Sequence, residues 1–222
     1  MQQTALNLIA IGVFLMTLSV FLVPLLNISP FIPAAATLGI MGLATLDTFT
    51  FQGRGVTLLL DRFAPTEYRQ RVIHHEAGHF LAAYLLGIPI ANYSITAWDA
   101  LKQGQPGLGG VQFDRAAIEE KIQDPLQFSL LIERLCTVWM AGIAAEKLTY
   151  GSSFGGEDDT QQLQMALKLA GVPQYSYPQK KNWGLVQAKN LIERNQTAYN
   201  ALVQAMSQRS TVEECINVIK QV

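Results

Sequence analysis

The first 46 residues carry no Asp, Glu, Lys or Arg, and this absence of charge limits what the chain can fold into more than any other feature. All 16 basic and 17 acidic residues lie in residues 47–222. Within the uncharged region, residues 5–26 form an apolar run long enough to cross a hydrocarbon core of about 30 Å as a helix. The start, MQQT, lacks the basic residues of a signal peptide, and the apolar run is longer than a signal peptide needs. The sequence therefore predicts a retained membrane anchor.

A second apolar stretch follows a predicted turn. The segment NISPFIP at 27–33 contains two prolines and an asparagine, and residues 34–46 are apolar again. We expect residues 1–46 to form a hairpin of two transmembrane helices; the alternative is one span followed by a re-entrant or interfacial helix. Basic residues begin only after this region, at Arg54 and Arg62. The positive-inside rule then predicts that the rest of the chain lies on the cytoplasmic side, or on the stromal side of a plastid membrane.

The remaining residues predict a connector at 47–63 and one mainly α-helical domain with a small β element at 64–222. A net charge of −1 gives no field that would attract nucleic acid. Cys136 and Cys215 lie far apart in apolar stretches, which predicts two reduced, buried thiols. Periodicity and turn residues predict helices at 64–87, 114–122, 125–149, 158–170, 183–207 and 211–221, strands at 90–98 and 111–113, a loop at 101–110 and a linker at 171–183.

All three histidines of the chain lie in the segment HHEAGH, residues 74–79, inside the predicted helix 64–87. His75 and His79 are four residues apart, so their side chains share one face of the helix and can occupy adjacent corners of a tetrahedral zinc site. Glu76 projects near the same face and can act as a general base. This is the His-Glu-x-x-His arrangement of zinc peptidases. His74 points to another side of the helix and is not expected among the ligands.

A catalytic zinc site needs a third protein ligand and one open position. No histidine remains and both cysteines are remote in sequence, so the third ligand should be a carboxylate. The segment GGEDD at 155–159 offers Glu157, Asp158 and Asp159, and Glu146 is a further candidate. Spacing alone leaves the choice among these four open.

Several stretches together resemble the protease domain of FtsH-type membrane-anchored zinc proteases. HHEAGHFLAAYLL is similar to the zinc helix of that family, and MAGIAAEKLTYG at 140–151 is similar to its Met-Gly-Gly-Arg-Ala-Ala-Glu-Glu stretch. GGEDDTQQLQMA at 155–166 resembles the segment that supplies the third ligand, and residues 191–216 resemble the closing helices. The resemblance covers residues 62–220, nearly all of the part that follows the anchor.

This resemblance implies an FtsH-like helical zinc-protease fold with particular site residues. His75, His79 and Asp159 would bind Zn²⁺, Glu76 would be the catalytic base, and Glu146 would at most support a ligand. The segment GGVQF at 109–113 resembles the edge strand beside the active site, where an extended peptide could pair with the sheet.

The chain departs from this family in one large respect. Only about 28 residues separate the apolar region from His75, and no G-x-x-x-x-G-K-[ST] phosphate loop occurs in the sequence, so the ATPase module of the family has no counterpart here. A smaller departure is that the Gly-Arg pair of the family is replaced by Gly142 and Ile143.

The expected function is that of a membrane-anchored, ATP-independent zinc metalloendopeptidase, a hydrolase that cleaves peptide bonds of membrane or membrane-proximal proteins. Its expected partners are protein substrates, the lipid bilayer, and either copies of itself or FtsH-like proteases; nucleic acid is not among them. The alternative is a non-proteolytic partner or assembly factor that docks onto a full-length FtsH-like complex. An intramembrane site-2-type protease is disfavoured, because the charged segment TEYRQRV directly precedes the histidine motif.

Overall fold

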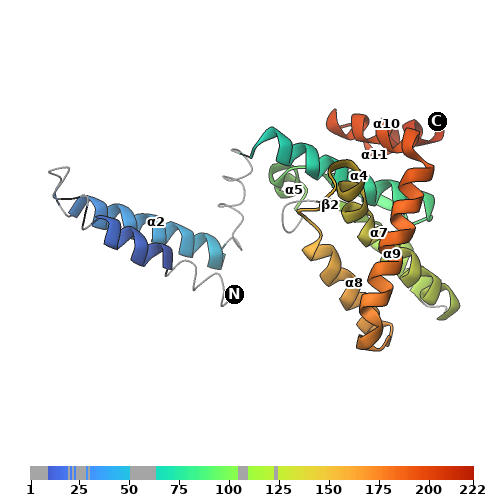
Figure 1. Cartoon of the computed structure of the whole chain (residues 1–222), viewed down its shortest axis with the longest axis horizontal. Helices are drawn as coiled ribbons and strands as arrows, with labels where there is room; N and C mark the ends of the chain where they lie inside the picture. The colour runs from blue at the N-terminus through green and yellow to red at the C-terminus, as the bar shows by residue number, and fades with distance from the viewer. Residues whose placement is uncertain are drawn as a thin grey trace. The chain divides into compact units, whose positions relative to one another are not determined.

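The computed structural model describes residues 10–19, 21, 23, 29, 31–50, 64–104, 110–122 and 125–222. The chain divides into two compact units, Met1–Phe63 and Ala64–Val222. The described residues are mainly helical and include one small two-stranded sheet, which confirms the predicted fold class at this level (Figure 1). Most of the predicted connector, residues 51–63, lies outside the described residues.

The first unit contains α2 (Phe31–Thr50) and a helical stretch at Ala10–Ser19. A Cβ added to Gly12 would lie 2.5 Å from the Sδ atom of Met41, so the two helical segments lie side by side (Figure 1). The predicted turn at 27–33 ends earlier than expected, because α2 already begins at Phe31. Pro33 is accommodated there, since the N–H groups of a first helical turn have no partner within the helix. The rest of the predicted span 5–26 lies largely outside the described residues.

Among the described residues, one helical segment is long and apolar enough to cross a membrane, and it lies in the second unit. This segment, Gln127–Tyr150, has 67% of its most apolar window buried inside the protein, as the core helix of a folded domain does. The two apolar helices of the first unit, Ala10–Ser19 and Phe31–Asp47, are shorter.

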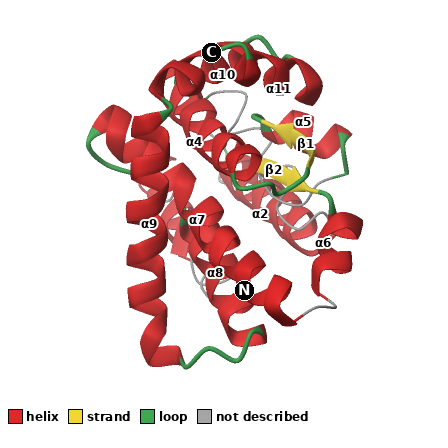
Figure 2. Cartoon of the chain, turned by 90° about the vertical axis from the view of Figure 1, so that its right-hand side faces the viewer, coloured by secondary structure: helices red, strands yellow, loops and turns green. Residues whose placement is uncertain are grey.

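The second unit is built around α7 (Pro125–Tyr150), which packs against four other helices (Figures 1 and 2). These are α4 (Thr66–Leu85), α6 (Arg115–Ile122), α8 (Glu157–Leu169) and α9 (Tyr177–Arg194). Two further helices, α10 (Gln196–Ser207) and α11 (Val212–Lys220), pack against each other, and α10 also contacts α4.

The small sheet lies against α4 and consists of β1 (Ile90–Ser94) and β2 (Gly110–Phe113), which run antiparallel (Figure 2). The predicted strand 90–98 is too long. Its last residues enter α5 (Ala97–Lys102), because the Thr96 side chain accepts a hydrogen bond from the backbone N–H of Asp99 and caps that helix. Residues 105–109 of the predicted loop lie outside the described residues.

Two other predictions are corrected near the C-terminus. The predicted helix 183–207 is two helices, because the backbone leaves helical geometry at Asn195 (φ −119°, ψ 35°). The predicted linker 171–183 is shorter, because a 3-10 turn (Gln174–Ser176) leads directly into α9, whose first turn accepts Pro178. The other predicted helices begin and end within two residues of the observed bounds.

The core is densest where α4 meets α7. Ala77, Phe80 and Leu81 of α4 and Ala141 of α7 are completely buried. A Cβ added to Gly78 would lie 2.4 Å from the carbonyl oxygen of Ala141, so the two helix backbones are in direct contact there. Cys136 and Cys215 are buried and free, as predicted.

Gly78→Ala should destabilise the protein despite the helix propensity of alanine. Helix propensity alone would increase the free energy of unfolding by up to about 1 kcal/mol. The new methyl group would, however, collide with the backbone of α7, and overpacking of this kind costs about 1–3 kcal/mol. Denaturant unfolding followed by circular dichroism, with the full chain in detergent, measures the balance. Gln70→Ala, on the exposed part of the same helix, is the control and should not lose stability. A Gly78→Ala protein as stable as the wild type would show that the helices are not in contact at this point.

Candidate metal centre

Helix α4 presents both histidines of the motif to the interior of the domain. The side chains of His75 and His79 are only 12% and 7% exposed, and their ring centroids are 4.7 Å apart. The helix begins after Pro65, carries Glu67 in its first turn and ends before Gly87, which has a φ of 68°. The i, i+4 spacing predicted from the sequence is therefore realised near the middle of a well-terminated helix.

Asp159 comes from α8 and completes a group of three. Its Oδ2 atom lies 3.0 Å from His75 Nε2, and its Oδ1 atom lies 3.3 Å from His79 Nε2. Gly156 makes this approach possible, because its φ of 99° turns the chain into α8 and a Cβ there would meet Ile143. One ligand atom from each of His75, His79 and Asp159 lies within 4.8 Å of the others, so this group could hold a metal ion.

The hydrogen bonds of the two imidazoles decide which nitrogens face the centre of the group. The Nδ1 atom of His75 lies 2.7 Å from Oε1 of Glu146, and the Nδ1 atom of His79 lies 2.7 Å from the carbonyl oxygen of Val138. A carbonyl oxygen can only accept, so Nδ1 of His79 carries a proton, and the carboxylate favours the same tautomer of His75. In the neutral imidazoles, both Nε2 lone pairs are then directed towards Asp159. Metal-binding histidines are usually oriented by partners of this kind.

Gly142 of α7 leaves the space that the group requires. A Cβ added to this residue would lie 2.4 Å from His75 Nε2 and 2.5 Å from His79 Nε2. Any larger residue would occupy the region into which both nitrogens point. The two nitrogens, the carboxylate and this gap together match the needs of a small divalent cation with three protein ligands.

Glu76 lies beside this group and is held by the sheet. Its residue is 9% exposed, and its Oε2 atom accepts a hydrogen bond of 3.0 Å from the backbone N–H of Val111 in β2. Burial raises the pKa of the Glu76 carboxyl above its usual value, and the charges of His79 and His75 only partly oppose this. A carboxylate with a raised pKa is a better proton acceptor than an exposed one.

The charges within the group favour a bound cation. Burial by itself would lower the pKa of His75, but hydrogen bonds to Asp159 and Glu146 outweigh it and raise this pKa to about 10. Burial alone would raise the pKa of Asp159. The charges of His79 and His75 and their hydrogen bonds to Asp159 outweigh burial, so this pKa lies well below its usual range. Protons on the imidazoles thus balance a buried carboxylate in the metal-free protein, and a metal ion can replace them.

The other candidates from the sequence lie elsewhere or act indirectly. Glu157 and Asp158 are exposed at the start of α8, so of the three neighbouring carboxylates the structure brings Asp159 to the histidines. Glu146 contacts His75 at Nδ1 and stays outside the group of three. His74 points away, with Nδ1 at 2.8 Å from the hydroxyl of Tyr199.

Sequence reasoning missed three contributors to the site. Two are backbone groups, the carbonyl of Val138 and the N–H of Val111, which no residue type reveals. The third is Arg71, which precedes His75 by four residues, is 9% exposed and lies 3.9 Å from Oε2 of Glu146. Its position on the histidine face of the helix was the available signal.

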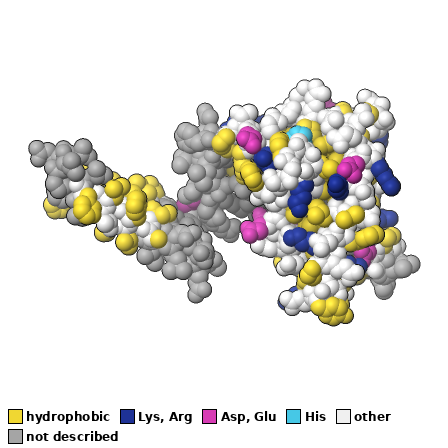
Figure 3. Space-filling view, in the orientation of Figure 1, with side chains coloured by type: hydrophobic (Ala, Val, Ile, Leu, Met, Phe, Trp, Pro, Cys, Tyr) yellow, Lys and Arg dark blue, Asp and Glu magenta, His cyan; other side chains and the backbone are white. Residues whose placement is uncertain are grey.

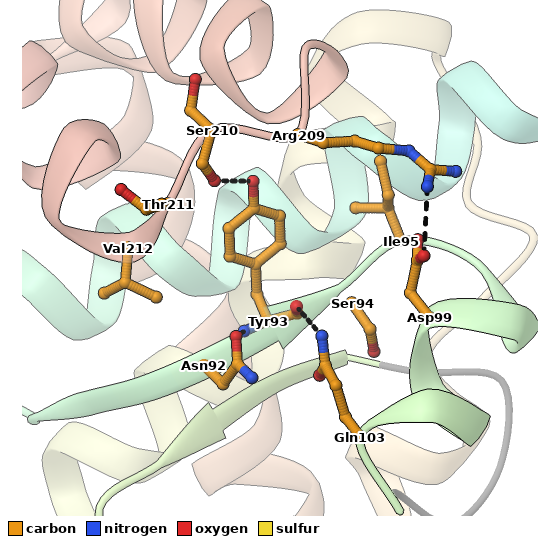
Figure 4. Close-up of a pocket in the computed structure, with 10 residues that line it drawn as sticks. All are labelled: Asn92, Tyr93, Ser94, Ile95, Asp99, Gln103, Arg209, Ser210, Thr211 and Val212. Carbon is orange, nitrogen blue, oxygen red and sulfur yellow. Dashed lines mark hydrogen bonds and ion pairs between the residues drawn. The ribbon is translucent and has the colours of Figure 1, made fainter.

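A polar cavity of about 210 Å³ lies apart from this group, between β1, α5 and the turn that joins α10 to α11 (Figure 4). Several polar side chains around it bond to one another or to backbone. Arg209 pairs with Asp99 at 3.1 Å, the Tyr93 hydroxyl donates to the carbonyl oxygen of Ser210, and the Gln103 amide donates to the carbonyl oxygen of Tyr93. These contacts fasten the α10–α11 turn to β1 through Tyr93 and to α5 through Asp99.

A scan against protein-family models finds no match for this chain, and a search of curated proteins finds none either.

Asp159→Asn should weaken zinc binding strongly. The substitution keeps the shape of the side chain but removes the negative charge that faces both Nε2 atoms. We expect at least about a 100-fold loss of affinity, the upper range for the loss of groups that only support a ligand. Competition with a chromophoric chelator measures the affinity. Asp158→Asn makes the same change at the adjacent exposed residue and should bind zinc normally; equal affinities for the two variants would exclude Asp159 as a ligand.

Zinc binding should release protons. The metal needs neutral imidazoles, whereas the metal-free His75, with a pKa of about 10, is protonated at pH 7. The affinity for zinc should therefore rise as the pH is raised towards 10 and fall on acidification. Isothermal titration calorimetry at pH 7 in buffers with different ionisation enthalpies counts the released protons. A binding heat that does not depend on the buffer would contradict this charge balance.

Proposed function

We propose that this chain is a membrane-anchored zinc endopeptidase related in design to the protease domain of FtsH-type enzymes. The observation that carries the proposal is the convergence of His75, His79 and Asp159 on one point, with Glu76 beside them. Two imidazoles and one carboxylate are a ligand set suited to catalytic zinc, which also needs one position free for the reaction. Bound zinc would act as a Lewis acid towards a peptide carbonyl and would lower the pKa of a water molecule bound to it towards about 7.

The protein's own groups would divide the remaining work. The Val111 N–H fixes Oε2 of Glu76, so the base has a defined orientation, and the carboxylate would take a proton from the attacking water. The same group would then return the proton to the leaving amine. Glu146 would keep the His75 ring in place, because it binds Nδ1 and is itself only 2% exposed.

Strand β2 offers a place for the substrate backbone. Gln112 and Val111 are in register with Asn92 and Tyr93 of β1, and the N–H of Val111 donates to Glu76. An extended peptide that lies along this edge would bring its backbone next to the base and the metal group. This supports an endopeptidase that accepts unfolded or loop segments, and it agrees with the absence of a phosphate loop from the sequence.

The first unit supports the proposed anchor. The side chains of Phe31, Leu38 and Leu43 on α2 are 85%, 76% and 70% exposed, and hydrophobic side chains cover much of its visible face (Figure 3). Many large apolar side chains exposed on one helix are stable in lipid and unfavourable in water. The proposed substrates are accordingly membrane or membrane-proximal proteins on the cytoplasmic or stromal side, with copies of the chain or FtsH-like proteases as further proposed partners.

Glu76→Gln should abolish peptide hydrolysis while leaving the fold and the zinc content unchanged. Glutamine preserves the size of the side chain but cannot accept the proton, and loss of a general base lowers kcat by about 10²- to 10⁴-fold. The assay follows cleavage of an unfolded protein by the full chain in detergent, with zinc and without nucleotide. Glu119→Gln, at an exposed position of α6, is the matched control and should retain full activity. Removal of zinc by a chelator should stop the wild type, and added zinc should restore it.

The same experiment can reject the proposal. Equal cleavage by the wild type and the Glu76→Gln protein would assign the activity to a contaminant or to another site. A folded, zinc-loaded wild type that cleaves no unfolded substrate would favour the alternative of a non-proteolytic partner of an FtsH-like complex, for which capture of its membrane partners is the next test.

A further inference from the structure

Arg71 is a buried cation one helical turn before His75. Its guanidinium carbon lies 4.2 Å from the ring centre of Tyr150 and 4.0 Å from that of Phe154. A buried arginine is costly unless its charge and its donors are matched, so its contacts indicate what it holds.

Those contacts lead to the α7–α8 loop, residues 151–156. Nη1 of Arg71 donates to the carbonyl oxygen of Ser152 at 3.4 Å and lies 3.9 Å from Oε2 of Glu146. Nη2 pairs with Glu67 at 3.4 Å, one turn earlier on the same helix. Together with the stacking on Phe154, these contacts fasten the loop to α4 at two of its residues.

The α7–α8 loop in turn is linked to two members of the metal group, His75 and Asp159. The N–H groups of Phe154 and Gly155 donate to Glu146 at 2.9 and 3.3 Å, and Glu146 holds Nδ1 of His75. A Cβ on Gly155 would lie 3.3 Å from the Cε1 atom of His75. The loop ends at Gly156, three residues before Asp159. The same loop therefore supports His75 through Glu146 and leads directly into the helix that carries Asp159.

We propose that Arg71 is a positioning residue of the metal centre, which fixes the α7–α8 loop against α4 and thereby sets the distance between His75 and Asp159. This inference rests on the metal site of the proposed function and adds a residue that acts through the loop, without touching the metal. The planar guanidinium suits the task, because it can stack on aromatic rings while its edge donates hydrogen bonds. A lysine could supply the charge but not this combination.

The test measures metal binding by the full chain in detergent. Zinc affinity is obtained by chelator competition, and the visible spectrum of bound cobalt(II) reports the coordination geometry. Arg71→Met, which keeps the length of the side chain, should weaken zinc binding by about 10- to 100-fold, the range for supporting groups around metal ligands. It should also alter the cobalt spectrum. Arg71→Lys should recover only part of the loss. Arg115→Met, at an exposed arginine, is the control and should behave as the wild type.

A double-mutant cycle identifies the route of the effect. If Arg71 acts through the loop and Glu146, its substitution should cost little more in a Glu146→Gln background than Glu146→Gln costs alone. If the losses of zinc affinity in the two single variants add fully in the double variant, the proposed route through Glu146 is wrong. A wild-type affinity and cobalt spectrum in Arg71→Met would overturn the positioning role itself.

Phe154→Ala keeps the proposal testable if Arg71→Met does not fold. Phe154 is 72% exposed, so its truncation leaves the core intact, while it removes one of the two rings that stack on Arg71. A smaller loss of zinc affinity in the same direction is expected, and unchanged affinity would count against the proposal. Because the readout is metal binding, a failure here differs from a failure of the proposed function, in which zinc binds normally to the wild type and no peptide is cleaved.

Discussion

Direct backbone contact between α4 and α7 is the constraint on which the rest of the site depends. With Gly78 against the carbonyl of Ala141, the two helices meet with no side chain between them at that point. Both histidines then lie within reach of α7, where the carbonyl of Val138 orients one ring and Glu146 orients the other. Gly142, one residue after Ala141, leaves the gap into which the two Nε2 atoms point. The small residues Gly78 and Gly142 therefore permit both the close packing of the two helices and the convergence of the metal-binding side chains.

The group carries an electrostatic cost that a bound cation would relieve. Asp159 and Glu76 are both largely buried near the two histidines, and burial alone opposes every one of these charges. In the metal-free protein the balance depends on protons, which are lost or gained with pH. A divalent cation would satisfy the same carboxylates in place of those protons, and binding to the folded state alone would add to its stability.

The sequence predicted the parts of this structure that depend on local pattern. The spacing of His75 and His79 placed them on one face of a helix because helical periodicity does not depend on distant residues. The third ligand was different: Glu157, Asp158 and Asp159 are chemically similar neighbours, and the family resemblance favoured the one that the fold brings to the histidines. The helix end at Asn195 was missed because the apolar pattern continues across it. No side-chain pattern could reveal the backbone partners Val138 and Val111.

The contact between Glu76 and β2 has an evolutionary consequence. The donor is the main-chain N–H of Val111, which nineteen of the twenty standard residues possess and only proline lacks. The hydrogen bond to the carboxylate therefore does not depend on the side chain at position 111, which instead packs against the hydrophobic core. A descendant of this chain could exchange Val111 for another apolar residue, and so adjust the packing beneath the strand, without first rebuilding the group that handles protons.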